Sequence, residues 1–203
     1  MKNVLRSLEL LYDDDDLLVM SKPAGVASVH DGNRPDTPDL SAILTEAYGK
    51  VLPVHRLDMD TSGVIVYARN EDAHRALSEQ FETREVEKVY HALLVGSPIW
   101  NDRNVDSPLL VDGDRRHRTI PDAKNGKPAI THFTVLNRMK GGTLVEAAPE
   151  TGRTHQIRAH AALLGFLVVN LAGFLGKLVA DIVRIFFDVF AHVAHHLHHR
   201  RQP

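Results

Sequence analysis

The segment His55-Arg56-Leu57-Asp58-Met59-Asp60-Thr61-Ser62-Gly63, with the apolar run Val64–Ala68 that follows it, decides how this chain is interpreted. It places Asp58 close to a basic residue, in a turn that leads directly into a strand. A carboxylate at the mouth of a strand, with cationic neighbours, meets the needs of a nucleophilic or acid–base site. The alternative is an ordinary polar turn, and the particular combination of residues favours the site.

The composition indicates one globular domain of ordinary size, or two very small ones. Of the 203 residues, 43% are hydrophobic and 25% are charged, which is enough for a real core. The absence of cysteine excludes disulfides, thiolate zinc sites and cysteine nucleophiles, and it fits a reducing compartment. The first residues lack the apolar core of a signal peptide, so we expect a cytoplasmic location.

The charges are distributed unevenly along the chain. The formal net charge of -2 argues against a strongly basic nucleic-acid binder. Asp13-Asp14-Asp15-Asp16 is an acidic block, whereas the middle of the chain carries a basic stretch. Its cations are Arg115, Arg116, His117, Arg118, Lys124 and Lys127. One basic face is compatible with a phosphate-bearing ligand, and a solvated loop is the alternative.

Apolar runs and turn residues predict strands and helices without the regular alternation of a parallel α/β fold. The expected strands are residues 17–20, 64–68, 89–96, 131–136 and 143–147, the last two joined by a Gly141-Gly142 turn. The expected helices are residues 37–48, 71–82 and 155–164, with Asn70 as an N-cap and Gly165 as a stop, and residues 99–126 are expected to be a loop. We therefore predict an α+β fold with a mostly antiparallel mixed sheet and flanking helices.

Two further segments could carry chemistry. In Glu150–His160, helical spacing puts Ile157 on the same face as later apolar residues and places Arg158 one turn from the helix start. From there its guanidinium could reach a carboxylate, and an exposed helix with ordinary cations is the alternative. In a strand, Lys88 and Tyr90 would share one face, so that the Tyr90 ring could stack on a base or sugar. The alternative is that Tyr90 belongs to the core.

Taken together, these segments resemble the RluA family of RNA pseudouridine synthases over roughly residues 10–165, about three quarters of the chain. They occur in the family's order and at compatible spacing. The matching segments are Leu18–Gly25, His55–Asp58 with Thr61–Gly63, Lys88–Tyr90, Gly126–Ala129 and Gly152–Arg158.

The resemblance implies an enzyme that converts uridine to pseudouridine within ribosomal RNA or tRNA, with no cofactor and no metal. The base is detached from its sugar, rotated and rejoined through carbon, which requires an ionised carboxylate. Asp58 matches the family's catalytic Asp, Arg158 the Arg that pairs with it, and Tyr90 the Tyr that packs on the uracil ring. A cation partner keeps a buried carboxylate ionised, and the target base must leave its stack.

The resemblance also implies contacts with the RNA around the target base. Arg56 matches the residue that fills the vacated position in the stack. Together with the basic stretch, the RNA-contacting residues that we expect are His55, Arg56, Thr61, Lys88, Arg116, Arg118, Arg153 and His155. We expect RNA as the partner, without DNA or a membrane. We also expect a monomer, as for most of the family, and association through the broad apolar face of the C-terminal helix is the alternative.

After Gly165 the sequence departs from the family. We therefore divide the chain into a catalytic domain of residues 1–165 and a divergent segment of residues 166–203, in which residues 177–190 predict a helix with a broad apolar face. Three interpretations of this segment compete. It is a replacement element packed on the core, a helix that faces a partner or a membrane, or a frame-shifted or truncated end. The abrupt break in the family pattern favours the third.

The C-terminal segment leaves two further questions open. Its terminal histidines include pairs at one-turn spacing, which can grip a metal, although a polar terminus is the favoured interpretation and we assign no metal site. Those histidines are His192, His195, His196, His198 and His199. The alternatives to an active enzyme are a catalytically impaired RNA-binding relative and a protein directed to a membrane or partner by the terminal helix.

Overall fold

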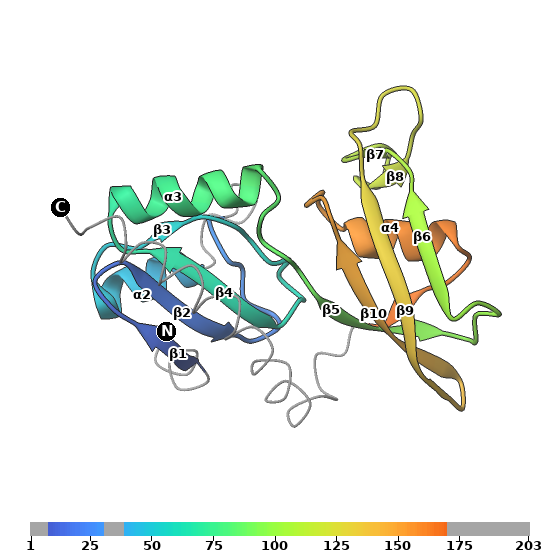
Figure 1. The fold of residues 1–203 in the computed structure, drawn as a ribbon, viewed down its shortest axis with the longest axis horizontal. Coiled ribbons are helices and arrows are strands. Elements are labelled where there is room, and N and C mark those ends of the chain that lie inside the picture. Colours follow the sequence, from blue (N-terminus) through green and yellow to red (C-terminus); the bar gives the residue numbers. More distant parts are fainter. Residues whose placement is uncertain (1–7, 31–38, 170–203) are drawn as a thin grey trace. The chain divides into compact units, whose positions relative to one another are not determined.

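The computed structural model describes residues 8–30 and 39–169. They form two compact units that divide after Val86 (Figure 1). Unit 1 holds residues 8–30 and 39–86, and unit 2 holds residues 87–169. Each unit combines an antiparallel sheet with helices, which confirms the predicted α+β class.

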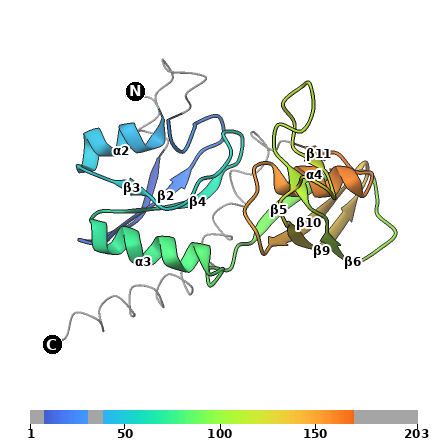
Figure 2. The ribbon, with the colours of Figure 1, turned by 90° about the horizontal axis from the view of Figure 1, so that it is seen from above.

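Unit 1 is built on a four-stranded antiparallel sheet in the order β1-β2-β4-β3. The strands are β1 (Glu9–Asp13), β2 (Leu17–Lys22), β3 (Leu52–Pro53) and β4 (Gly63–Ala68), and the helices are α2 (Leu40–Tyr48) and α3 (Glu71–Glu82). Figure 2 shows α2 and α3 on opposite sides of this sheet. Because both faces of β2 and β4 are covered, these central strands are continuous apolar runs rather than alternating ones.

Polar side chains and glycine set the ends of the unit 1 helices where the sequence predicts them. The Asp39 carboxylate accepts a hydrogen bond from the Ala42 amide at the start of α2. Gly49 ends that helix with φ +83°, a conformation that glycine adopts without steric cost. Asn70 caps α3 in the same way by accepting from the Ala73 amide. Local sequence therefore marks where both helices begin and where α2 ends.

Unit 2 is built on a five-stranded antiparallel sheet in the order β11-β5-β10-β9-β6. The strands are β5 (Tyr90–Val95), β6 (Asp102–Asp106), β9 (Ile130–Met139), β10 (Gly142–Pro149) and β11 (Val168–Val169), and the helix is α4 (Gln156–Leu163). One face of the sheet packs with Ala161 of α4 around Phe133 and Val145, and Ile157 and Leu164 pack against this core. The apolar face that the sequence predicts for this helix is confirmed.

The predicted loop of residues 99–126 is partly wrong, because it contains β6 and a short ribbon of β7 (Leu109–Leu110) and β8 (Ile120–Pro121). Only Val105 of β6 is buried, so its side chains give no strand pattern. Pairing with β9 makes it a strand. The edge strands β1, β3 and β11 were missed for the same reason, since a partner on one side and few buried side chains leave little trace in the sequence.

The C-terminal helix and the terminal histidines expected within residues 166–203 lie outside the described residues, which end at Val169 in β11. In the described part of the chain, no helix is long and apolar enough to cross a membrane.

Gly126 provides a test of the packing of the β7–β8 ribbon. A Cβ at this position would lie 2.8 Å from the Pro108 carbonyl carbon and 2.9 Å from the Leu109 nitrogen, both backbone atoms. We expect Gly126→Ala to lower the free energy of unfolding by about 1–3 kcal/mol, measured by urea denaturation. Gly152→Ala is the matched control, because a Cβ there meets open space. Equal stability of the two variants would contradict this packing.

Candidate active site

Asp58 lies in a tight turn between β3 and β4 of unit 1. Its backbone oxygen accepts a hydrogen bond from the Thr61 amide at 3.0 Å, and its side chain is half-buried. The next carbonyl, that of Met59, accepts from the Gly25 amide at 2.8 Å and from Lys22 Nζ at 3.1 Å. These two hydrogen bonds attach the turn to the end of β2 and to the residues that follow it. They hold the backbone next to Asp58 in one orientation.

Lys22 is the residue of this site that the sequence prediction missed. Its side chain is fully buried, and Nζ also donates to the Pro23 carbonyl at 3.0 Å. Burial lowers the pKa of Lys22 to about 8, and the carboxylates of Asp58 and Asp60 act in the opposite direction. A cation therefore faces the Asp58 turn from within unit 1. The sequence signals were the position of Lys22 at the end of an apolar run and its place in the Leu18–Gly25 segment that matches the family.

Ser28 anchors the other side of the Asp58 turn. Its Oγ donates to the Leu57 carbonyl at 2.7 Å and accepts from the Leu57 amide at 3.1 Å. The carbonyl of Ser28 accepts from the Tyr67 hydroxyl at 2.9 Å, and burial raises the pKa of Tyr67, so that this donor stays protonated. The residue before Asp58 is therefore held as firmly as the residue after it.

Three residues that we expected to contact RNA accompany Asp58 in unit 1. His55 accepts a hydrogen bond from the Val66 amide at 3.0 Å through Nε2, and its ring stacks on Phe81 with centroids 4.7 Å apart. These contacts give His55 a structural role. Arg56 is exposed and Thr61 is half-buried. Arg56 is therefore an accessible cation in the same loop as Asp58, two residues before it.

Tyr90 and Lys88 belong to unit 2. Tyr90 begins β5, and its half-buried ring packs against the core of the unit. Lys88 precedes the strand, so the shared strand face that we predicted for the two residues does not form. Lys88 Nζ instead donates to the Glu150 carbonyl at 3.4 Å.

The loop after β10 and the start of α4 carry three of the expected cations. Arg158 is exposed in the first turn of α4. Arg153 is half-buried, and its Nε donates to the Pro128 carbonyl at 3.1 Å. His155 is the N-cap of α4 and has φ +54°, in the left-handed region that side chains other than glycine rarely adopt. Asp58 and Arg158 lie in different units, so their pairing stays a proposal.

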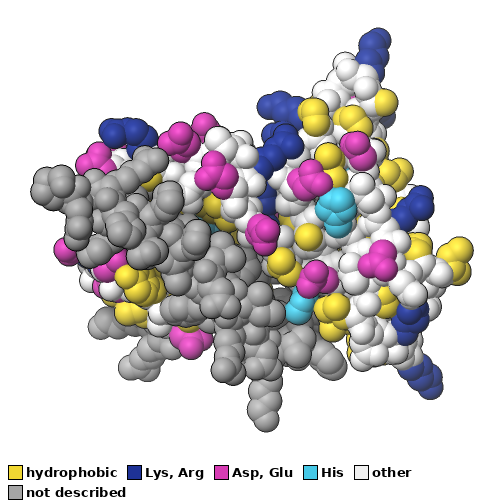
Figure 3. Space-filling model, in the orientation of Figure 1, with side chains coloured by type: hydrophobic (Ala, Val, Ile, Leu, Met, Phe, Trp, Pro, Cys, Tyr) yellow, Lys and Arg dark blue, Asp and Glu magenta, His cyan; other side chains and the backbone are white. Residues whose placement is uncertain are grey.

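The basic stretch forms an ordered turn at the end of the β7–β8 ribbon. Asp114 Oδ1 accepts from the amides of Arg116 and Arg118, and Oδ2 accepts from Arg118 Nε at 2.6 Å. The bond from Arg118, with the backbone bonds, lowers the pKa of Asp114 to about 2. Figure 3 shows Lys and Arg side chains gathered around this end of unit 2. Arg118 is thus committed to Asp114, whereas the exposed Arg116 side chain is directed to solvent.

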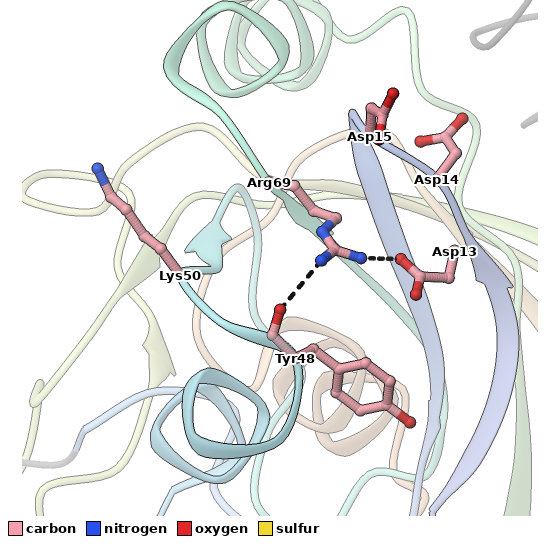
Figure 4. A pocket seen from close by; sticks show the side chains of 6 residues that line it. All are labelled: Asp13, Asp14, Asp15, Tyr48, Lys50 and Arg69. Carbon is pink, nitrogen blue, oxygen red and sulfur yellow. Dashed lines mark hydrogen bonds and ion pairs between the residues drawn. The ribbon is translucent and has the colours of Figure 1, made fainter.

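The acidic block forms a separate surface pocket of about 430 Å³ in unit 1 (Figure 4). Arg69 lies between Asp13, with which it pairs, and the Tyr48 carbonyl, to which it donates at 3.0 Å. Asp14 Oδ1 accepts from the amides of Asp16 and Leu17. These carboxylates therefore stabilise the β1–β2 turn, and none of the expected site residues lines the pocket. Among the described residues, no group of three His, Cys, Asp or Glu side chains could hold a metal.

Comparison with known proteins defines the family. The model of the RNA pseudouridylate synthase family matches residues 16–163. An uncharacterized RNA pseudouridine synthase of Zymomonas mobilis is 42% identical over 166 residues, covering 79% of this chain and 75% of that protein. The dual-specificity RNA pseudouridine synthase RluA of Haemophilus influenzae is 41% identical over 165 residues, covering 80% and 75%. The chain belongs to the RNA pseudouridine synthases, which are isomerases acting on RNA.

A solved structure agrees with this assignment. Human RNA pseudouridylate synthase domain containing 1 superimposes with a TM-score of 0.68 at 28% identity, covering 83% of this chain and 70% of that one. The pseudouridine synthase fold expected from the sequence is therefore confirmed.

Lys22 gives a pH-dependent prediction. Between pH 8 and pH 10.5 the unfolded chain still binds the proton that folded Lys22 has released, so the free energy of unfolding rises with pH across this window. Lys22→Met removes the titrating group, and we expect wild type to gain stability relative to this variant as the pH rises. Urea denaturation at a series of pH values measures the difference. A difference that does not change with pH would contradict a depressed pKa at Lys22.

Proposed function

We propose that this chain isomerises specific uridines of ribosomal RNA or tRNA to pseudouridine, with Asp58 as the catalytic carboxylate. The observation that carries the proposal is the Asp58 turn, which is fastened on both sides and faced by the buried Lys22 cation. A firmly held carboxylate with cationic surroundings can stay ionised while partly buried. We propose that both units belong to one catalytic domain of residues 1–165, with residues 166–203 as a separate segment.

The reaction needs no net gain or loss of atoms. The bond between the sugar carbon and the ring nitrogen breaks, and a bond from the same sugar carbon to a ring carbon forms. The ring carbon loses one proton to solvent, and the ring nitrogen gains one proton. We propose that Asp58 acts at the sugar and the base, that Arg158 pairs with Asp58, and that Tyr90 packs on the detached ring. A positioned carboxylate suits such a reaction because the base must remain bound between the two bond changes.

The choice between ribosomal RNA and tRNA rests on shape and on loops rather than on the carboxylate. One relative is named as a dual-specificity enzyme, which is why both RNA classes belong in the test. We propose that the exposed Arg56 fills the position in the stack that the target base leaves, that the exposed Arg116 contacts the RNA backbone, and that the protein acts as a monomer.

The catalytic assignment is tested with Asp58→Asn, which keeps the shape of the side chain and removes its charge. We expect no pseudouridine from this variant, because an amide can neither act as a nucleophile nor take up a proton, whereas RNA binding should persist. The measurement is pseudouridine formation on unmodified ribosomal RNA and tRNA by the full chain. Asp60→Asn is the matched control in the same turn and should keep most of the activity.

Each result of this assay decides between functions. Product from Asp58→Asn at the rate of wild type would refute the assignment of the carboxylate. No product from wild type, with folded protein and RNA binding that weakens with salt, would favour the catalytically impaired relative.

The RNA surface is tested with Arg116→Ala. Each lost phosphate contact should reduce the slope of log affinity against log salt by roughly 0.7–0.9. Arg75→Ala makes the same change of charge on the exposed face of α3, where Arg75 lies beside Asp72. We expect Arg116→Ala to flatten the slope measured by filter binding and Arg75→Ala to leave it unchanged. Equal salt slopes for the two variants would show that the β7–β8 ribbon does not contact RNA through Arg116.

A further inference from the structure

A series of hydrogen-bonded, buried polar side chains lies under the loop that carries Arg153 and His155 and under the first turn of α4, which carries Arg158. Thr131 of β9 and His160 of α4 are fully buried, and Gln156 of α4 and Thr151 are each 4% exposed. Buried polar groups without partners cost free energy, so the partners of each group can be checked one by one.

Gln156 links three segments, and its partners fix the orientation of its amide. Its Oε1 accepts from the Thr151 hydroxyl at 2.7 Å and from the Arg153 amide at 3.0 Å. Its Nε2 donates to the Ile130 carbonyl at 2.8 Å and to Thr131 Oγ1 at 2.9 Å. Because a backbone amide only donates and a carbonyl only accepts, the reverse amide orientation is excluded. All four hydrogen-bonding positions of this side chain are used.

Thr131 passes the chain on to His160. The Thr131 hydroxyl, which accepts a hydrogen bond from Gln156, also lies 2.9 Å from His160 Nδ1. The Ser107 carbonyl, which only accepts, lies 3.0 Å from His160 Nε2, so Nε2 carries a proton. In a neutral ring, Nδ1 then accepts from the Thr131 hydroxyl. Burial lowers the pKa of His160, against the opposing effects of the Ser107 carbonyl and of Asp106, which agrees with a neutral ring.

This hydrogen-bond network ends at two segments of unit 2. Each of these segments leads to basic residues that we expect to contact RNA. One end holds the Arg153 amide, two residues before His155, the N-cap of α4 with a left-handed backbone conformation. A non-glycine residue in the left-handed region is sterically strained and persists only where its surroundings hold it. The other end holds Ser107, which precedes the β7–β8 ribbon and the Asp114 turn.

We infer that Gln156, Thr131 and His160 are positioning residues for the reaction: their hydrogen-bond chain holds the start of α4, with Arg153 and Arg158, at a fixed place relative to the base of the basic ribbon. The inference rests on the proposed function, since it assigns these residues a role in that activity. The three side chains are buried and do not themselves touch RNA. Their effect on the rate passes through the arginines, whose displacement by about 1 Å can cost 10²-fold in rate.

The test compares Thr131→Val with Thr131→Ser. Valine has the shape of threonine but neither accepts from Gln156 nor donates to His160, whereas serine keeps the hydroxyl. We expect Thr131→Val to lower kcat for pseudouridine formation by about tenfold or more, with KM for RNA changed by less than about threefold, and Thr131→Ser to restore most of kcat. Val145→Ala, in the core of the same sheet, serves as the control for lost stability alone.

All rates are compared at a temperature at which every variant is folded. If Thr131→Val and Val145→Ala lose stability to the same extent and have the same kcat, the hydrogen bonds of Gln156, Thr131 and His160 only stabilise the fold, and the inference is overturned. A failure of Thr131→Ser to restore the rate would overturn it as well.

A second readout separates this inference from the proposed function. NMR of the His160 ring in the full chain should show the Nε2–H tautomer in wild type and Thr131→Ser. In Thr131→Val the Nδ1 signal should shift. The Nδ1–H tautomer in wild type would overturn the inference even if pseudouridine is formed. The expected tautomer in a protein without activity would instead mean that the proposed function has failed.

Discussion

The hydrogen bond from the buried Lys22 to the Met59 carbonyl is the contact on which the Asp58 turn depends. Moving an ammonium group out of water is costly, so Lys22 can be buried only if its protons are accepted and carboxylates lie nearby. The carbonyls of Pro23 and Met59 and the charges of Asp58 and Asp60 meet these conditions. The requirement is mutual: the turn keeps the cation in place, and the cation keeps the turn against β2.

Unit 2 solves a comparable problem without a buried cation. The segment that leads into α4 is held by three buried polar side chains, Gln156, Thr131 and His160, which are linked to one another by hydrogen bonds. In both units a surface segment that carries charged side chains is attached to a packed sheet by side chains of the strands and helices. Such attachment limits the movement of the charged groups, which is what a reaction with a specific geometry demands.

The sequence predicted the parts of the fold that depend on local rules. The double-sided burial of β2 and β4 leaves continuous apolar runs, and Asn70 and Gly165 mark helix ends. The edge strands β1 and β6 were missed because pairing with a neighbour, rather than side-chain pattern, makes them strands. Lys22 was missed because a lysine at the end of a strand is normally exposed, and its burial depends on acceptors such as the Met59 carbonyl that lie far away in the sequence. The proposed pairing of Asp58 with Arg158 was inferred from the resemblance alone, because the two residues belong to different units.

The measurement that tests the central claim most directly is a crystal structure of the full chain bound to an RNA hairpin that contains a target uridine. The account predicts that the uridine leaves its stack, and that the Asp58 carboxylate lies within hydrogen-bond distance of its sugar or ring and within about 4 Å of the Arg158 guanidinium. An extruded uridine with Asp58 turned away from it, or with Arg158 paired elsewhere, would contradict the account.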